Sequence, residues 1–168
     1  MDETRQRSVT FSHAALEHID SLYGYAMTLT RDQTEAEDLV QETYLRAVRA
    51  FDQLATNSNL KSWLFVIMRN AWLNQLRHLQ SGPRFIGLDD EEDGLGNWPD
   101  QRVPDPHVIY LRKLESAEIN AAIDNLPNLY REIIVLRDLE GFSYQEIATM
   151  LGCPAGTLMS RLGRAREK

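Results

Sequence analysis

Side chains capable of covalent catalysis are spread too thinly along this sequence to form a recognisable catalytic pattern. The four histidines have no partner at metal-ligand spacing, and the single cysteine is not near any of them in sequence. No glycine-rich phosphate loop follows a predicted strand, and no serine lies in a nucleophile-elbow context. The residues concerned are His13, His18, His78, His107 and Cys153. The sequence therefore predicts a protein that is not an enzyme and that has neither a metal site nor another cofactor.

The C-terminal residues 143–168 carry the pattern of a helix-turn-helix. Ser143 and Glu146 are spaced as a capping box, in which the hydroxyl and the carboxylate each satisfy an amide of a starting helix. Gly152 stands where a left-handed helix end is needed, and Pro154 suits a position just inside the next helix. That second helix carries four cations against one acid, namely Arg161, Arg164, Arg166 and Lys168 against Glu167. We interpret it as a DNA-recognition helix.

Residues 61–79 combine aromatic, amide and cationic side chains on a predicted helix that contains no acid. The run from Trp63 to Met68 is apolar in every direction around a helix, and Trp72 follows it. Aromatic rings beside cations and amides can hold unstacked single-stranded bases, at about 1–3 kcal/mol for each stacked base. The candidates are Lys61, Trp63, Arg69, Asn70, Asn74 and Arg77. For each tryptophan the alternative is a place in the core of a small domain.

The helix predicted before this one has the opposite character, because acids crowd its first half. Thr34 and Glu37 are spaced as a second capping box, and acids near a helix start interact favourably with its dipole. Asp38, Gln41 and Glu42, however, share one side of the helix, outside its predicted apolar face. The residues of that apolar face are Val40, Tyr44, Ala47, Val48 and Phe51. The acidic side disfavours DNA and suits a basic protein surface.

Helical periodicity runs through residues 11–79 and resumes after residue 106, without convincing strand alternation. The predicted helices are Ala14 to Leu29, Thr34 to Asp52, Lys61 to Leu79, Val108 to Asn125 and Asn128 to Leu139, before the helix-turn-helix. The stretch between the two halves is too acidic, and too often broken by Gly and Pro, to pack. The alternative role for this acidic stretch is to mimic nucleic acid and shield a basic groove. We therefore predict an all-α chain with two small helical domains, 1–80 and 106–168, joined by a flexible acidic linker, 81–105.

Composition limits the class of protein further. A chain of 168 residues is long enough for one ordinary domain or two small ones. The net charge of −7 is unusual for a nucleic-acid binder, so the two basic segments in an acidic chain matter more than the sum. The N-terminus is polar, and no apolar run approaches the roughly 18 residues of a membrane span. One cysteine suits a reducing compartment, which predicts a cytoplasmic protein without membrane contact of its own.

Three segments together resemble a known family. Residues 35–47 (EAEDLVQETYLRA) resemble the core-binding helix in region 2 of sigma-70-type factors, in particular of the small extracytoplasmic-function (ECF) group. Residues 60–70 (LKSWLFVIMRN) resemble the promoter-melting helix that follows and reads the −10 element. Residues 136–148 and 151–162 resemble region 4, which reads the −35 element. The segments occur in the order of the family, with the linker in the usual place.

The resemblance implies a function and a role for each matching residue. It implies an alternative sigma factor that binds core RNA polymerase, through the β′ clamp helices and the β subunit, and directs initiation at specific promoters. The polymerase contacts would be Asp38, Gln41 and Glu42. The −10 contacts would be Thr56, Asn57, Ser58, Asn59, Lys61, Trp63, Arg69, Asn70, Asn74 and Arg77, the first five around a flipped base. The −35 contacts would be Thr157, Ser160, Arg161 and Arg164, with Arg166 and Lys168 on phosphates.

Two further expectations accompany this hypothesis. Members of the family are commonly held by an anti-sigma factor, so a partner of that kind is expected beside core polymerase and promoter DNA. The alternative function is a stand-alone helix-turn-helix regulator without polymerase-dependent activity, which would leave the N-terminal domain unexplained. Transcription by core polymerase in the presence of the protein separates the two.

Overall fold

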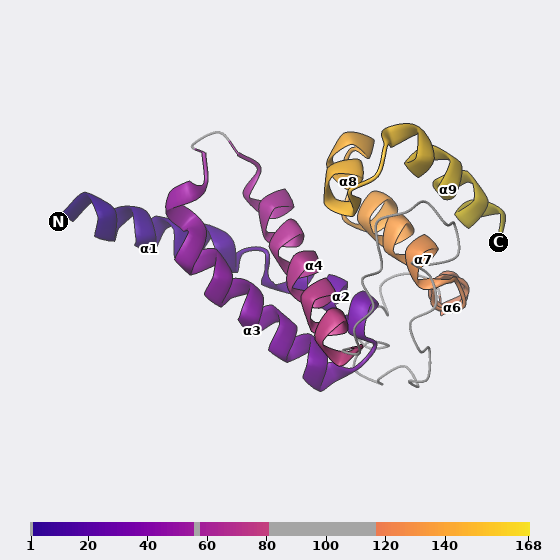
Figure 1. Cartoon of the computed structure of the whole chain (residues 1–168), viewed down its shortest axis with the longest axis horizontal. Coiled ribbons are helices and arrows are strands. Elements are labelled where there is room, and N and C mark those ends of the chain that lie inside the picture. Colours follow the sequence, from indigo (N-terminus) through magenta and orange to yellow (C-terminus); the bar gives the residue numbers. More distant parts are fainter. Residues whose placement is uncertain (1, 56–57, 81–116) are drawn as a thin grey trace. The chain divides into compact units, whose positions relative to one another are not determined.

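The computed structural model describes residues 2–55, 58–80 and 117–168, and every element in these ranges is helical (Figure 1). The all-α prediction is confirmed for this part of the chain. The predicted acidic linker, 81–105, lies outside the described residues, as does most of the helix predicted from Val108. The chain forms two compact units, Met1–Leu73 and Asn74–Lys168, and the division falls inside a helix. The domain limits predicted from sequence, 1–80 and 106–168, stay a prediction.

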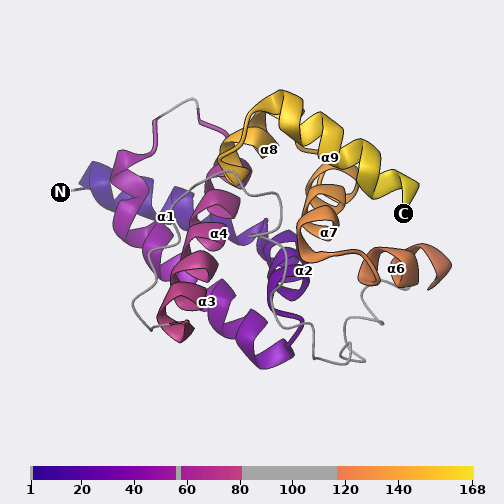
Figure 2. The ribbon, with the colours of Figure 1, turned by 45° about the vertical axis from the view of Figure 1, so that its right-hand side comes forward.

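The first unit contains four α-helices and one short turn of 3₁₀-helix. The helices are α1 (Asp2–Leu16), α2 (Ile19–Thr30), α3 (Gln33–Ala50), the 3₁₀ turn η1 (Phe51–Gln53) and α4 (Leu60–Leu79), which extends into the second unit. Helix α2 packs along α3, and α4 lies beside α3 in both Figure 1 and Figure 2. Tyr25 of α2 stacks on Phe65 of α4 with ring centroids 4.8 Å apart, and both side chains are fully buried. The core of this unit therefore includes one face of α4.

The first helix predicted from sequence is in fact two helices. The chain leaves the α-helical conformation at Glu17 and His18, between α1 and α2. The prediction of a single helix from Ala14 to Leu29 is therefore wrong. The hydroxyl of Tyr44 on α3 donates a hydrogen bond to the Ala15 carbonyl, at 2.7 Å. A tertiary contact thus satisfies a carbonyl at the end of α1, which removes the need for a sequence signal such as Gly or Pro.

The start of α3 also differs from the prediction. The N-cap is Asp32, whose carboxylate accepts a hydrogen bond from the Glu35 amide at 2.9 Å, so Thr34 lies inside the helix. Asp and Thr are both good capping residues, and the sequence offers both within one turn. The carboxylate occupies the cap here, and the capping box predicted at Thr34 and Glu37 is wrong.

The second unit contains the predicted helix-turn-helix and the helices that support it. Its further elements are α6 (Ala117–Asp124), α7 (Asn128–Ile134), the π-helical turn η2 (Val135–Leu139), α8 (Tyr144–Leu151) and α9 (Ala155–Glu167). Helix α9 packs on α7 and on α8 (Figure 2). The core includes Ile133, Leu136, Ile147 and Leu158, which are fully buried.

Local signals set the geometry of the helix-turn-helix. The capping box is confirmed, because Ser143 accepts from the Glu146 amide while the Glu146 carboxylate accepts from the Ser143 amide. Gly152 ends α8 in the left-handed region at φ 64°, as predicted. Pro154 is the N-cap of α9 rather than its first helical residue, one position earlier in the helix than expected. These signals position the start of α9 on α8.

Candidate nucleic-acid and protein interfaces

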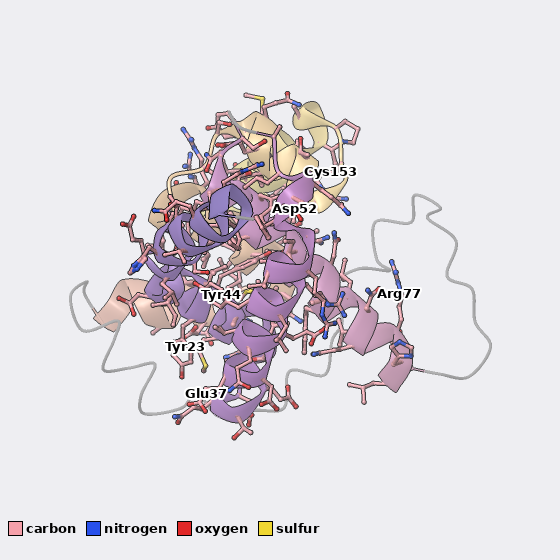
Figure 3. The ribbon with its side chains drawn as sticks, turned by 90° about the vertical axis from the view of Figure 1, so that its left-hand side faces the viewer. Tyr23, Glu37, Tyr44, Asp52, Arg77 and Cys153 are labelled. Carbon is pink, nitrogen blue, oxygen red and sulfur yellow. The ribbon has the colours of Figure 1, made fainter. Side chains whose placement is uncertain are left out.

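The outward face of α4 carries four of the predicted −10 residues. Trp63, Asn70, Asn74 and Arg77 are spaced seven, four and three residues apart, which places them on one side of a helix. The opposite side is the buried one, and it includes Leu64, Phe65, Met68, Ala71 and Trp72. Asn70 and Arg77 are exposed, and Figure 3 shows Arg77 extending away from the helix. The Arg77 guanidinium donates to the Asn74 amide oxygen at 3.3 Å, so a cation and an amide meet on this face.

The two tryptophans of α4 have different surroundings. Trp72 is only 7% exposed, which agrees with the alternative of a core residue. Trp63 is half-buried and meets the Phe11 ring edge-on, with centroids 6.1 Å apart. Phe11 in turn stacks on Phe51 at 5.5 Å. Trp63 is therefore held by an aromatic cluster while part of its surface stays accessible.

The other predicted −10 residues are not brought onto this face. Arg69 is only 8% exposed, on the buried side of α4. Lys61 is half-buried at the start of the helix, with its ammonium 5.8 Å from the centre of the Phe65 ring. Ser58 and Asn59 are exposed, and the Asn59 side chain accepts from the Ser62 amide at 3.2 Å, which caps α4. Thr56 and Asn57 lie outside the described residues.

Helix α3 presents a mixed stripe on its outward face. Asp38 and Gln41 are exposed, as predicted, and Leu45 and Val48 continue the same line at helical spacing. Leu45 is 54% exposed and Val48 is 50% exposed, so the prediction that Val48 faces the core is wrong. Leu39, which is fully buried, belongs to the inner face instead. The intervals of three, four and three residues from Asp38 to Val48 could have revealed this stripe in the sequence.

Glu42 differs from the other two predicted polymerase contacts. It is half-buried, and its carboxylate accepts from the Arg46 guanidinium at 2.6 Å, one turn further along α3. An exposed pair of this kind contributes little to stability. It does neutralise part of the acidity, so the charge of the stripe resides mainly in Asp38. Glu37 is also exposed but lies outside the stripe, near the start of the helix in Figure 3.

The outward face of α9 carries most of the predicted −35 residues. Thr157, Ser160 and Arg164 are exposed and Arg161 is half-exposed, at spacings of three, one and three residues. The inner face is formed by Leu158, Leu162 and Ala165, all of which are buried. The helix thus separates cationic and hydroxyl side chains from its apolar side, as a groove-reading helix requires.

The two predicted phosphate contacts of α9 have partners within the second unit. Arg166 donates to the Asp138 carboxylate at 2.8 Å. The hydrogen bond with Asp138, and then its charge, raise the pKa of Arg166 above the usual value. Lys168 lies with its ammonium 5.8 Å from the centre of the Tyr130 ring on α7. Both residues are exposed, and neither is among the four residues that share the outward face.

Two further properties concern the part of the chain that the structure describes. There, no three His, Cys, Asp or Glu side chains come together as a metal site would require. None of the helices in that part has the length and apolar character needed to cross a membrane.

Comparison with known proteins connects these faces to a family. The family model described as sigma-70 region 2 matches residues 15–81, which include α3 and α4. The model described as sigma-70, region 4 matches residues 116–168, which include the helix-turn-helix. The ECF RNA polymerase sigma factor EcfG of Rhodopseudomonas palustris is 37% identical over 150 residues, covering 89% of this chain and 77% of the relative. The chain belongs to the ECF group of the sigma-70 family.

Other relatives of this sigma factor agree. The RNA polymerase sigma-H factor of Pseudomonas aeruginosa is 31% identical over 159 residues, covering 94% of this chain and 82% of the relative. A solved structure of the sigma factor RpoE in complex with the anti-sigma factor NepR, from Bartonella quintana, matches with a TM-score of 0.66 and 31% identity. The match covers 94% of this chain and 92% of that one. Sigma factors are DNA-binding proteins of transcription initiation, so the alternative of a stand-alone regulator is disfavoured.

Proposed function

We propose that this ECF sigma factor acts in the cytoplasm, without catalysing a reaction itself, by dividing its three contacts among three helices. The stripe of α3 binds core RNA polymerase, the outward face of α9 reads duplex −35 DNA, and the outward face of α4 holds unstacked −10 bases. The observation that carries this assignment is the separation of charge between helices. Acid, amide and apolar side chains line α3, whereas cations, hydroxyls and amides line α9 and α4.

The α3 stripe fits a protein partner better than DNA. Its acidic end would repel phosphates, while Leu45 and Val48 offer exposed apolar surface that a nucleic-acid backbone cannot cover. A basic clamp helix with apolar residues complements both parts. We therefore extend the proposed polymerase contact from Asp38, Gln41 and Glu42 to Leu45 and Val48.

The face of α4 supports base capture after the duplex opens. Opening costs a few kcal/mol for each base step, so a protein that promotes melting must gain contacts only in the open state. Partly exposed Trp63 offers a surface for stacking, and the Asn70 and Asn74 amides can bond base edges. Arg69 is left out of this proposal because its side chain is buried.

A charge-reversal pair tests the polymerase contact. Asp38→Lys places a cation in the stripe, whereas Glu37→Lys makes the same charge change one residue away, on an exposed acid outside it. Run-off transcription with core polymerase should fall about tenfold or more for Asp38→Lys, because like charges then face each other at the contact. Glu37→Lys should keep most of the wild-type activity. Equal loss in both variants would show that only the overall charge matters.

An experiment that requires no known promoter sequence tests the whole function. Core polymerase and the protein are incubated with fragmented genomic DNA, and the 5′ ends of the transcripts are sequenced. We expect transcripts that share two upstream elements and that disappear when either component is left out. Absence of any such transcript, with tight binding of the protein alone to DNA at physiological salt, would favour the stand-alone regulator.

An anti-sigma factor is the second proposed protein partner. The matched Bartonella structure contains one, and the α3 stripe offers a surface on which an inhibitor would exclude polymerase. The inhibitor and core polymerase should then compete for the chain in a pull-down assay. Simultaneous binding of both would contradict a shared surface.

A further inference from the structure

Arg166 lies apart from the other cations of α9. It follows Arg164 by two residues, which on a helix turns its side chain roughly 200° away from the outward face. There it meets Asp138 of the π-helical turn η2, at 2.8 Å between a guanidinium nitrogen and a carboxylate oxygen. The Arg166 and Asp138 side chains are 51% and 39% exposed. The pair therefore lies at the surface and is not part of the buried packing of α9.

The turn that carries Asp138 connects α7 to the helix-turn-helix. Arg137, the preceding residue, donates to the Phe142 carbonyl at 2.7 Å, and its guanidinium carbon lies 4.4 Å from the centre of the Tyr144 ring. Tyr144 is the first residue of α8, and after Asp138 it also helps to raise the pKa of Arg166. Neighbouring residues of one π turn therefore contact the start of α8 and the last turns of α9. Single π turns within helices are frequent at functional sites.

The charges around Arg166 argue against a phosphate contact. Asp138 already neutralises the guanidinium, and a DNA phosphate would have to displace this carboxylate or share its donors. The group that Arg166 contacts is the Asp138 carboxylate, which belongs to η2 and is therefore held by the structure that supports α9. The pair thus connects the C-terminal half of the recognition helix to its support.

We propose that Asp138 and Arg166 form a brace that fixes the orientation of α9 for reading the −35 element, and that Arg166 is a positioning residue and not a phosphate contact. This inference rests on the proposed function of α9, and it replaces the role predicted for Arg166 from sequence. Loss of the brace lets the last turns of α9 shift, although the outward side chains remain on the same face of the helix. It lowers discrimination between −35 sequences and leaves the number of neutralised phosphates unchanged.

Binding of holoenzyme to promoter DNA separates the two roles. Holoenzyme made with each variant is titrated with a promoter fragment obtained by the 5′-end sequencing, and with the same fragment carrying a scrambled −35 element, over a series of KCl concentrations. Arg166→Gln and Asp138→Asn should each lower the ratio of the two affinities about two- to fivefold, the range expected from an exposed ion pair. The slope of log affinity against log salt should stay at the wild-type value. Arg164→Gln, on the outward face, should reduce that slope by about 0.9.

Exchanging the two charges gives the sharpest test. Asp138→Arg combined with Arg166→Asp restores an ion pair with the opposite polarity, so the brace predicts recovery of the affinity ratio. A carboxylate at position 166 beside a phosphate would instead weaken binding below either single variant. That weakening, a reduced salt slope in Arg166→Gln, or tighter DNA binding by Asp138→Asn would each overturn the brace.

Two controls keep the result interpretable. Thermal unfolding of wild type, Asp138→Asn, Arg166→Gln and the variant with both of these substitutions, compared as a double-mutant cycle, should show coupling between positions 138 and 166, and its absence would also overturn the brace. Arg166→Lys retains the charge and should recover part of the affinity ratio. If wild-type protein fails to start transcription with core polymerase, the proposed function fails, and the unfolding cycle still decides whether the brace exists.

Discussion

Helices α4 and α9 are both proposed to contact DNA, yet they are built into their units in different ways. Six residues of α4 are buried, including Phe65, Arg69 and Trp72, so this helix is itself a large part of a core. In α9 the buried residues are Leu158, Leu162 and Ala165, and the helix rests on α7 and α8. Binding and folding are therefore combined in α4, whereas in α9 the binding face is separate from the supporting structure. Substitutions on the outward face of α9 should therefore change DNA binding without changing stability, whereas many substitutions in α4 should change both.

The largest effect is expected where α9 receives its support. Arg131 of α7 is 1% exposed and donates to the carbonyls of Ile123, Asp124 and Leu126, at 3.3, 2.7 and 2.8 Å. Arg131→Met would leave these acceptors at the end of α6 without their donor. We expect the free energy of unfolding of the second unit to fall by about 3–5 kcal/mol, since one bond to a charged group contributes roughly 1.5–3 kcal/mol and bonds of the same side chain do not add in full.

Chemical denaturation followed by circular dichroism measures this loss. Arg161→Met is the matched control, because the same substitution at a half-exposed position on α9 should change stability by less than about 0.5 kcal/mol. A similar loss in both variants would mean that the support of α9 is not concentrated in α7.

Two arginines of α4 provide the next comparison. Arg69→Gln removes a buried charge and should destabilise the first unit by about 1–3 kcal/mol, because the partners of a buried polar group lose their bonds. Arg77→Gln changes an exposed residue and should leave the melting temperature unaltered while it weakens open-complex formation, measured by permanganate reactivity of the melted strand. A purely functional defect in Arg69→Gln, with normal stability, would contradict the assignment of Arg69 to the core.

The same contrast explains what could be predicted from sequence. In α9 the apolar and polar residues alternate with helical period, so its outward face could be read directly, apart from Arg166, whose partner comes from a distant turn. In α4 apolar residues surround the helix, and periodicity alone could not tell that Arg69 is buried while Asn70 is exposed. The prediction of the whole fold class did not depend on such details and is confirmed for the described residues.

Helix boundaries followed local chemistry only where one signal was present. At α8 the box of Ser143 and Glu146 has no competitor, and it was predicted correctly. At α3 two capping residues lie within one turn, and Asp32 was missed. The break at Glu17 and His18 and the left-handed Arg31 at the end of α2, with φ 57°, are not typical of these residue types, so residue type alone did not reveal them.

The capping box provides a smaller test on the α9 side of the comparison. Ser143→Ala should lower the stability of the second unit by about 1 kcal/mol, the usual effect of losing a cap. Thr149→Ala, an exposed hydroxyl that bonds only the Gln145 carbonyl of its own helix, serves as the control and should change stability much less. Denaturant midpoints at constant slope provide the measurement. Equal effects would indicate that α8 is held mainly by its packing on α9.

The smallest effect concerns the contact between α1 and α3 in the first unit, which also contains most of α4. Burial, and then the negative charge of Asp20, raise the pKa of Tyr44 above its usual value of 10.0. Because the folded state holds the phenolic proton more tightly, the contribution of Tyr44 is fully present below about pH 10 and is lost as the pH rises toward the folded pKa. Tyr44→Phe removes the 2.7 Å bond to Ala15 and should cost about 1 kcal/mol at neutral pH. The difference in unfolding free energy between wild type and variant should shrink as the pH rises above about 10, and a constant difference would show that the phenol does not titrate in this environment.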